Sequence, residues 1–264
     1  MTAPLGPAAV IRIAGRDAIA FAHGQFTSDV KSLDPGAWHW SAWLDAQGRA
    51  RAVFALLRTG EDELHAWQPL GDAAPLAAAL ARFVLRAAAR VEALEAHALA
   101  PGAGDAVAAG RLETRDGGWA FTLGDGRAVR LVPGAGPVAD EATLAAWRLR
   151  DVEARLPLLP AAMAGQYTPQ ALDLEAIDAI RFDKGCYPGQ EVAARLHFRG
   201  GNKRRLRRAG VDGAFEPGQP LLAGAGETVG HILYGAPAGR VLAVVTEGAP
   251  NELQTPAGTP VRLG

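Results

Sequence analysis

The sequence predicts an α+β fold that ends in a small antiparallel β-barrel. Strand-like alternation at Val10–Ile13 and in the aromatic run 38–42 is followed by apolar residues at helical spacing from Leu76. Strands that flank a helix and then continue as further strands favour ferredoxin-like subdomains. Beyond Asn202 the chain turns to Gly, Pro and β-branched residues in short, regularly spaced strands, which is typical of a small barrel.

Length and composition limit the class of protein. The chain has 264 residues, a net charge of −1 and one cysteine. We expect residues 1–200 to form the main region, with roughly 50–135 as an inserted lobe, and residues 203–264 to form the barrel. The balanced charge argues against a dedicated nucleic-acid-binding protein. One cysteine excludes an intrachain disulfide and a self-contained four-cysteine iron–sulfur site.

Targeting and metal signals are absent from the sequence. The first residues carry no basic segment followed by an apolar run, and no apolar stretch approaches the roughly 20 residues that span a bilayer. The six histidines never fall at metal-site spacing. We therefore expect a cytoplasmic protein without a metal site of its own and without a membrane partner.

The N-terminal elements place two polar residues at their ends. Ala18–Gly24 reads as a helix, and Gln25 follows it; the strand at 38–42 leads into the turn Asp45–Gly48 and then a second strand, Ala50–Leu57. Gln25 is either a helix-end cap or a ligand-binding group. Asp45 either shapes its turn or faces a ligand.

The next helix is expected to begin at Asp72, a capping residue, with Pro75 in the first turn. One apolar stripe follows at helical spacing: Leu76, Leu80, Phe83, Val84 and Ala87. Arginines recur every four residues on the other side, at Arg82, Arg86 and Arg90. This row is either a solvated helix face or a phosphate-facing surface.

A further helix is predicted over Asp140–Asp151, with Trp147 on its inner side and Glu153 just beyond it. Trp147 offers either core packing or a flat face for a ligand. Glu153 is either an exposed helix-end charge or a carboxylate that accepts two parallel N–H bonds.

The most informative stretch is Lys184–Glu191, which contains the cysteine. Pro188 and Gly189 mark a turn, and good helix formers follow from Gln190. Cys186 is therefore expected just ahead of a helix N-terminus, where the helix dipole and the charge of Lys184 favour a thiolate. The alternative is a small buried apolar cysteine.

The run Lys-Gly-Cys-Tyr-Pro-Gly-Gln-Glu-Val-Ala-Ala-Arg from Lys184, with Phe-Arg-Gly-Gly-Asn-Lys-Arg from Phe198, resembles the signature of the YgfZ family. These proteins are similar to the glycine-cleavage T-protein. The resemblance implies a T-protein-like folate-binding fold, tetrahydrofolate or another folate as cofactor, and a role in assembly or repair of iron–sulfur enzymes, including enzymes that thiolate tRNA. The implied partners are iron–sulfur enzymes or assembly proteins, and tRNA.

The resemblance also assigns roles to residues. Cys186 becomes the reactive thiol and Lys184 its assistant. The implied folate contacts are Glu153, Trp147, Tyr187, Gln190, Gln25 and Asp45. The chain departs from the family at Arg155, where glycine is usual, and near Ala8, where a small residue stands in place of a tryptophan.

Two other functions stay open from the sequence. The first is a tetrahydrofolate-dependent aminomethyltransferase like the T-protein, so whether the chain is an enzyme is undecided. The second is an RNA-binding module that uses the basic run Lys203–Arg208, of which only alternate side chains can share one face.

Overall fold

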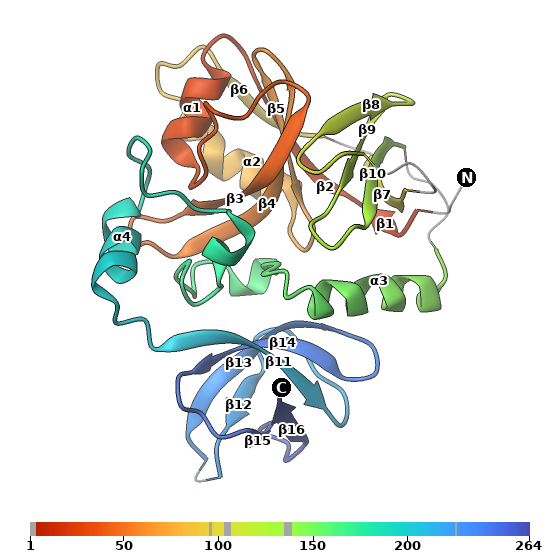
Figure 1. The fold of residues 1–264 in the computed structure, drawn as a ribbon, viewed down its shortest axis with the longest axis vertical. Coiled ribbons are helices and arrows are strands. Elements are labelled where there is room, and N and C mark those ends of the chain that lie inside the picture. Colours follow the sequence, from red (N-terminus) through yellow and green to blue (C-terminus); the bar gives the residue numbers. More distant parts are fainter. Residues whose placement is uncertain (1–3, 95–96, 103–106, 135–138, 225) are drawn as a thin grey trace.

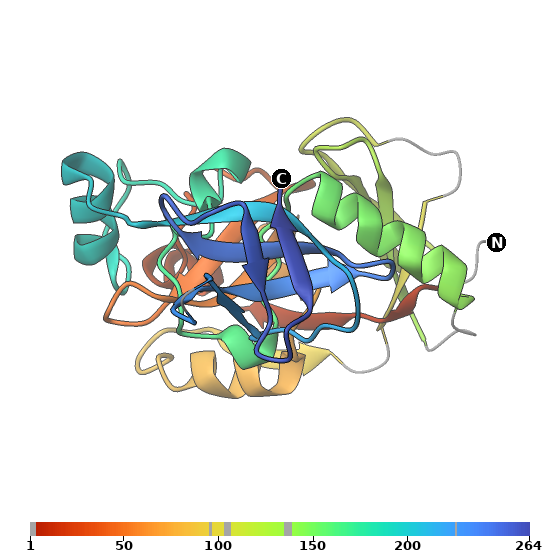
Figure 2. The ribbon, with the colours of Figure 1, turned by 90° about the horizontal axis from the view of Figure 1, so that it is seen from below.

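The computed structural model describes residues 4–94, 97–102, 107–134, 139–224 and 226–264 (Figure 1). Two antiparallel sheets form the upper body, and a closed barrel lies below them. Helix α3 (Glu141–Glu153) runs between the two parts (Figures 1 and 2). Of the described helices, none is long and apolar enough to cross a membrane.

The first sheet has the strand order β3–β4–β5–β2–β6. These strands span Ala37–Leu44, Ala50–Gly60, Glu63–Gln68, Ala9–Ala14 and Arg90–Leu94. Side chains alternate between the two faces of a strand. On β2, Ile11 and Ile13 therefore share a core with helices α1 (Ala18–Gln25) and α2 (Ala73–Ala81), whereas Val10 belongs to the core on the other face.

The second sheet covers that other face. Its order is β1–β7–β10–β9–β8, with bounds Gly6–Pro7, His97–Pro101, Ala128–Pro133, Gly118–Thr122 and Leu112–Arg115. Trp38 of β3 meets Phe121 of β9 with ring centroids 4.8 Å apart. Trp38 and Trp40 of the aromatic run on β3 thus belong to the largest core, which also includes Trp147 of α3.

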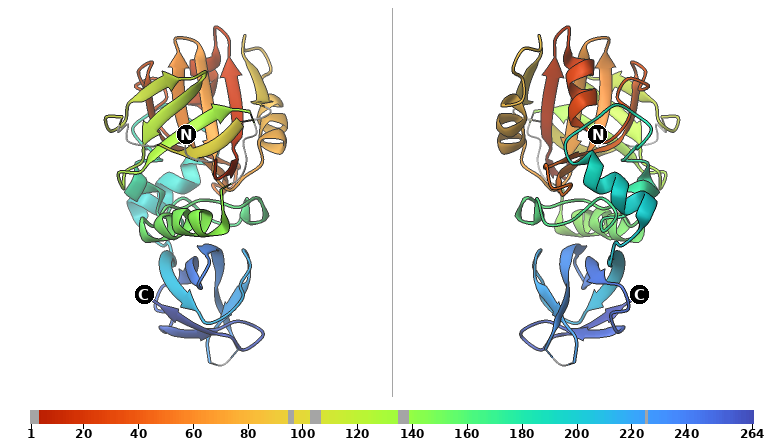
Figure 3. Two further views of the ribbon diagram at one scale, coloured as in Figure 1. Left: turned by 90° about the vertical axis from the view of Figure 1, so that its right-hand side faces the viewer. Right: turned by 90° about the vertical axis from the view of Figure 1, so that its left-hand side faces the viewer.

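The barrel follows the order β11–β14–β13–β12–β15–β16. Its strands span Arg204–Val211, Arg240–Thr246, Thr228–Ala236, Pro220–Leu222, Glu252–Gln254 and Pro260–Leu263. Figure 3 shows the barrel as a separate layer beneath α3 in both views. Its outer face nevertheless joins the main core, through residues such as Leu233 and Tyr234. The prediction of an α+β fold with a C-terminal antiparallel barrel is confirmed.

The connection from α3 to the barrel contains the remaining helices. Two short 3₁₀ helices, η1 (Ala161–Met163) and η2 (Leu174–Ile177), precede α4 (Gln190–Arg199). The helix predicted to begin at Gln190 is therefore confirmed. Figure 1 places α4 on the side of the molecule opposite the N-terminus, below α1.

The helix that was predicted to carry the apolar stripe as far as Ala87 ends earlier, at Ala81. Val84 and Ala87 still pack against the core beside α2, although they lie outside the helix. Phe83 consequently lies outside the helix and is 48% exposed. The cause is tertiary: the Asp17 side chain accepts a hydrogen bond from the Ala88 amide at 2.7 Å, and the Asp17 amide donates to the Ala88 carbonyl at 3.1 Å. These bonds draw the chain out of the helix so that β6 can pair with β2.

Pairing divides the segment that was expected to form an inserted lobe. Strands β4, β5 and β6 belong to the first sheet with β2 and β3, whereas β7 to β10 form the second sheet with β1. The domain boundaries drawn from the sequence remain a proposal.

Candidate functional site

The cysteine loop, residues 181–189, presents the thiol at the surface. Cys186 is exposed, so it is not the small buried residue of the alternative interpretation. Helix α4 begins at Gln190, and Gly189 precedes it with a φ of 74°. The thiol therefore lies just before a helix N-terminus, as the sequence predicted.

Lys184 holds this loop in place through three hydrogen bonds. Its Nζ donates hydrogen bonds to the carbonyls of His23 at 2.6 Å, Phe26 at 2.6 Å and Ser28 at 2.9 Å. Burial lowers the pKa of Lys184 to about 8. Since an ammonium group has three hydrogens, all of them are used by carbonyls at the end of α1 and just after it. Lys184 thus holds the cysteine loop to residues 23–28, and its assistance to the thiol stays a prediction.

A glycine–glycine contact joins the loop to the β3–β4 hairpin. A Cβ on Gly189 would lie 2.4 Å from the Asp45 carbonyl oxygen and 2.6 Å from the Gly48 Cα. A Cβ on Gly48 would in turn lie 2.9 Å from the Val192 Cβ on α4. Both glycines also have positive φ, which favours glycine. The hairpin turn and the start of α4 can meet this closely only because neither position carries a side chain.

Several predicted folate contacts belong to the frame of the loop. The Tyr187 hydroxyl donates to the Arg181 carbonyl at 3.0 Å, and its ring lies 5.0 Å from the Lys184 Nζ. The Gln190 amide donates to the Lys184 carbonyl at 3.5 Å. Asp45 accepts from the amides of its own turn, at 3.0 Å from Gln47 and 2.9 Å from Arg49. These three side chains therefore stabilise the loop and the hairpin.

Gln25 lies in the same assembly, at the C-terminal end of α1. Its neighbours His23 and Phe26 are the carbonyl partners of Lys184. The Gln25 Oε1 is buried and accepts no hydrogen bond from the described residues. A buried amide oxygen without a donor is costly, so this atom is free to serve a ligand or a water molecule.

The two predicted folate contacts on α3 lie elsewhere. In Figures 1 and 2, α3 and α4 are at opposite sides of the molecule. Trp147 is buried, and the Arg127 guanidinium lies 4.5 Å from its ring centroid. Glu153 is exposed at the end of the helix and pairs with none of the described residues. The described contacts therefore group Cys186, Lys184, Tyr187, Gln190, Gln25 and Asp45, and none of them joins Trp147 or Glu153 to this group.

A buried ion network explains the position of Trp147. Arg127 pairs with Asp151 at 2.8 Å and with Asp125 at 2.6 Å, and its Nη1 donates to the Trp147 carbonyl at 3.1 Å. Burial raises the pKa of Asp151, although Arg127 and Arg148 act against this rise. The network fixes α3 against the β9–β10 turn.

Arg155, which stands where the family usually has glycine, has a backbone conformation that favours glycine. Arg155 has a φ of 53°, in the left-handed region where glycine is preferred. Its guanidinium donates to the Leu206 carbonyl at 2.7 Å and to Asp173 at 3.0 Å. The side chain that strains the backbone thus attaches the end of α3 to the first strand of the barrel.

Sequence reasoning missed a buried polar cluster beside Lys184. The Ser28 Oγ lies 2.9 Å from the His39 Nε2 and donates to the Ser41 Oγ at 2.7 Å. Burial lowers the pKa of His39 to about 4, so its ring is neutral at pH 7. Alternation on β3 puts His39 and Ser41 on one face, and this signal could have revealed the cluster.

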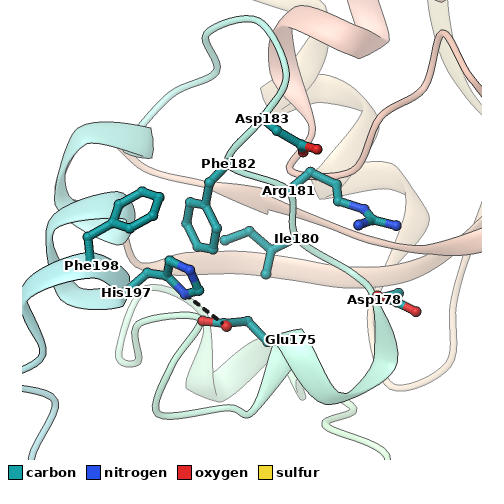
Figure 4. A pocket seen from close by; sticks show the side chains of 8 residues that line it. All are labelled: Glu175, Asp178, Ile180, Arg181, Phe182, Asp183, His197 and Phe198. Carbon is teal, nitrogen blue, oxygen red and sulfur yellow. Dashed lines mark ion pairs between the residues drawn. The ribbon is translucent and has the colours of Figure 1, made fainter.

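A pocket of about 390 Å³ lies between the start of the cysteine loop, η2 and the C-terminal end of α4 (Figure 4). The His197 ring stacks on Phe182 at 4.3 Å, and its Nδ1 lies 2.9 Å from a Glu175 carboxylate oxygen. Phe198 beside them is 73% exposed. The contacts of His197 are therefore with Glu175 and the two phenylalanines, and none of the described hydrogen bonds joins it to Cys186.

Three of the five basic residues in the run Lys203–Arg208 have partners in the barrel or close to it. The Arg204 guanidinium lies 5.6 Å from the Tyr167 ring, Arg205 pairs with Glu247 at 3.4 Å, and Arg207 donates to the Gly264 carbonyl oxygen at 3.0 Å. RNA binding by this run stays a prediction. Because three of its side chains already have partners within the protein, fewer of its positive charges are available to contact phosphates. No cluster of His, Cys, Asp and Glu among the described residues could hold a metal ion.

Comparison with known proteins gives consistent results. The chain is 30% identical over 236 residues to the tRNA-modifying protein YgfZ of Vibrio vulnificus strain YJ016, covering 80% of this chain and 69% of that protein. It is 55% identical over 60 residues to the tRNA-modifying protein YgfZ of Serratia proteamaculans, covering 23% of this chain and 18% of that protein. No family model matches the chain.

Among solved structures, the glycine cleavage system aminomethyltransferase T from Bartonella henselae is similar, with a TM-score of 0.67 and 17% identity. The match covers 98% of this chain and 83% of that protein. At this identity the likeness shows the fold alone. The predicted T-protein-like fold is confirmed.

Proposed function

Because the chain belongs to the YgfZ family, we propose that it supports the assembly or repair of iron–sulfur enzymes, including enzymes that thiolate tRNA, through the thiol of Cys186. The observation that carries this proposal is the exposure of Cys186 on a loop in which the nearby side chains of Lys184 and Tyr187 form hydrogen bonds to the protein backbone. Such a thiol is accessible to a partner.

A single cysteine limits the chemistry that the chain performs. A thiolate can hold one corner of an iron–sulfur cluster, whereas clusters are usually held by four protein ligands. Any cluster at Cys186 is therefore shared with a second chain or an external thiol. Transient handling of a cluster as cargo fits this thiol better than storage.

Tetrahydrofolate, or another folate, is the proposed ligand. The unpaired carboxylate of Glu153 fits the aminopyrimidine edge of a pterin, which offers two parallel N–H donors. The unpartnered Gln25 Oε1 fits a ligand donor near the cysteine loop. Trp147 does not fit as a stacking platform, because Arg127 covers its ring and the surrounding core buries it. Folate binding should weaken in Glu153→Gln and stay unchanged in Glu141→Gln at the other end of α3.

The test of the function uses cells that lack the protein and carry either the unchanged chain or Cys186→Ser. Because Cys186 is exposed, the variant should fold normally, which its unfolding midpoint checks. We expect iron–sulfur enzyme activity to be restored by the unchanged chain alone. Full restoration by Cys186→Ser would refute the role of the thiol.

The same protein can be tested as an aminomethyltransferase, the activity named for the solved structure of similar fold. Incubation with aminomethylated lipoyl carrier and tetrahydrofolate should give no methylene-folate. Formation of that product would replace the present proposal.

A further inference from the structure

A cleft of about 460 Å³ lies between the β3–β4 hairpin and the segment that follows α2. Its walls come from three parts of the chain: Trp43, Asp45 and Arg51 of the hairpin, Arg82 and Phe83 after α2, and Pro188 of the cysteine loop. A second hollow of about 220 Å³ adjoins it and shares Trp43 and Arg51. The larger cleft alone is of the size that small-molecule sites have.

The apolar wall of this cleft is aromatic. The rings of Trp43 and Phe83 meet edge to face, with centroids 5.8 Å apart and planes at 81°. Phe83 is 48% exposed because α2 ends at Ala81, so its ring is open to the cleft rather than buried in the stripe that its spacing suggests. Large exposed aromatic groups of this kind favour planar ligands.

The polar wall is positively charged. Arg51 and Arg82 are exposed, and neither makes a hydrogen bond or ion pair with any residue that the structure describes. The carboxylate of Asp45 borders the same cleft, but its Oδ1 already accepts two amides of the hairpin turn. Guanidinium groups suit planar anions, since they donate two parallel N–H bonds to a carboxylate or phosphate.

We propose that this cleft binds a planar aromatic molecule that carries an anionic group. The ring lies against Phe83 and Trp43, and the phosphate or carboxylate pairs with Arg51 and Arg82. Pro188 is two residues beyond Cys186, so the ligand lies beside the cysteine loop. Of the implied folate contacts, Asp45 borders this cleft, whereas Glu153 and Trp147 do not. The proposal does not depend on the proposed function.

The test titrates the full chain with two kinds of probe, by calorimetry at low salt. Nucleoside 5′-monophosphates supply a phosphate on a heterocycle, and 4-aminobenzoylglutamate supplies carboxylates on a benzoyl ring. We expect at least one kind to bind, and Arg51→Gln, Arg82→Gln or Phe83→Ala to weaken that binding about tenfold or more. The kind that binds identifies the source of the anionic group.

The chain provides matched controls on the same segment. Arg86 and Leu85 are exposed and do not line the cleft, so Arg86→Gln and Leu85→Ala should leave binding unchanged. The proposal is overturned if neither probe binds at millimolar concentration. It is equally overturned if Arg86→Gln weakens binding as much as Arg51→Gln does, because binding would then reflect overall charge.

Discussion

Lys184 shows how one side chain decides the shape of the site. Its three hydrogen bonds to the carbonyls of His23, Phe26 and Ser28 connect the cysteine loop to the end of α1 and the residues that follow it. Lys184 and Phe26 are 158 residues apart in the sequence. The position of Cys186 therefore depends on a lysine that need not touch it.

Replacing Lys184 by Met should remove these bonds while keeping the length of the side chain. Hydrogen bonds to charged groups contribute about 1.5–3 kcal/mol, so the free energy of unfolding should fall by about 2–4 kcal/mol. Urea unfolding measures this loss. Lys31→Met is the control, because Lys31 is exposed and its side chain forms no described bond. Equal stability of the two variants would show that the anchor is unimportant.

Two buried histidines should make the protein sensitive to acid. Burial lowers the pKa of His39 to about 4 and that of His65 to about 4, whereas an unfolded histidine titrates near about 6.5. Because the folded pKa is the lower one, the stabilisation is complete above pH about 6.5 and is lost as the pH falls toward 4. We expect roughly 2 kcal/mol of loss for each histidine between pH 7 and pH 5. Urea unfolding at several pH values tests this, and His39→Gln should remove about half of the dependence.

At the scale of elements, the site is made by docking α4 onto the β3–β4 hairpin. Gly48 and Gly189 permit the contact, and Lys184 draws in the end of α1. Three elements that are distant in the sequence thus surround one loop.

Gly189→Ala should break this docking. The new Cβ would lie within 2.4 Å of the Asp45 carbonyl and would also occupy a φ of 74°, so we expect a loss of about 3 kcal/mol or more. Gly258→Ala, at a φ of 81° in a turn of the barrel with open space around it, should cost only about 1 kcal/mol for the backbone conformation. Thermal unfolding compares the two. Equal losses would mean that the close approach contributes nothing.

The elements were more predictable than the contacts between them. Strand alternation at Val10–Ile13, the start of α4 at Gln190 and the barrel all follow from local pattern. The end of α2 could not be predicted, because it depends on Asp17 bonding to Ala88 across the fold. The structural roles of Lys184 and Trp147 could not be predicted either, since each side chain contacts residues that are distant in the sequence.

For the whole molecule, the barrel is attached at the segment after α3. Arg155 donates to the Leu206 carbonyl, and the Tyr234 hydroxyl donates to the Leu156 carbonyl at 2.7 Å. The apolar outer face of the barrel packs on the same segment. The body and the barrel therefore share one core across this joint.

Two variants of Arg155 distinguish the stability that its hydrogen bonds contribute from the cost of its left-handed backbone conformation. Arg155→Ala keeps the left-handed backbone and loses the bonds, which should cost about 1–2 kcal/mol. Arg155→Gly also loses the bonds but relieves the backbone, so it should be about 1 kcal/mol more stable than Arg155→Ala. Calorimetry of Arg155→Ala combined with Tyr234→Phe should show the barrel unfolding in its own transition. A single unchanged transition would show that these bonds do not hold the joint.

The claim that unites these scales is that the molecule holds one exposed thiol for use by partner enzymes. The most direct measurement is the content of thiolated nucleosides in tRNA, by mass spectrometry, from cells that lack the protein and carry the unchanged chain or Cys186→Ser. We expect the unchanged chain to restore the thiolated nucleosides and the equally abundant, folded Cys186→Ser variant to leave them depleted. Full restoration by Cys186→Ser would contradict the account.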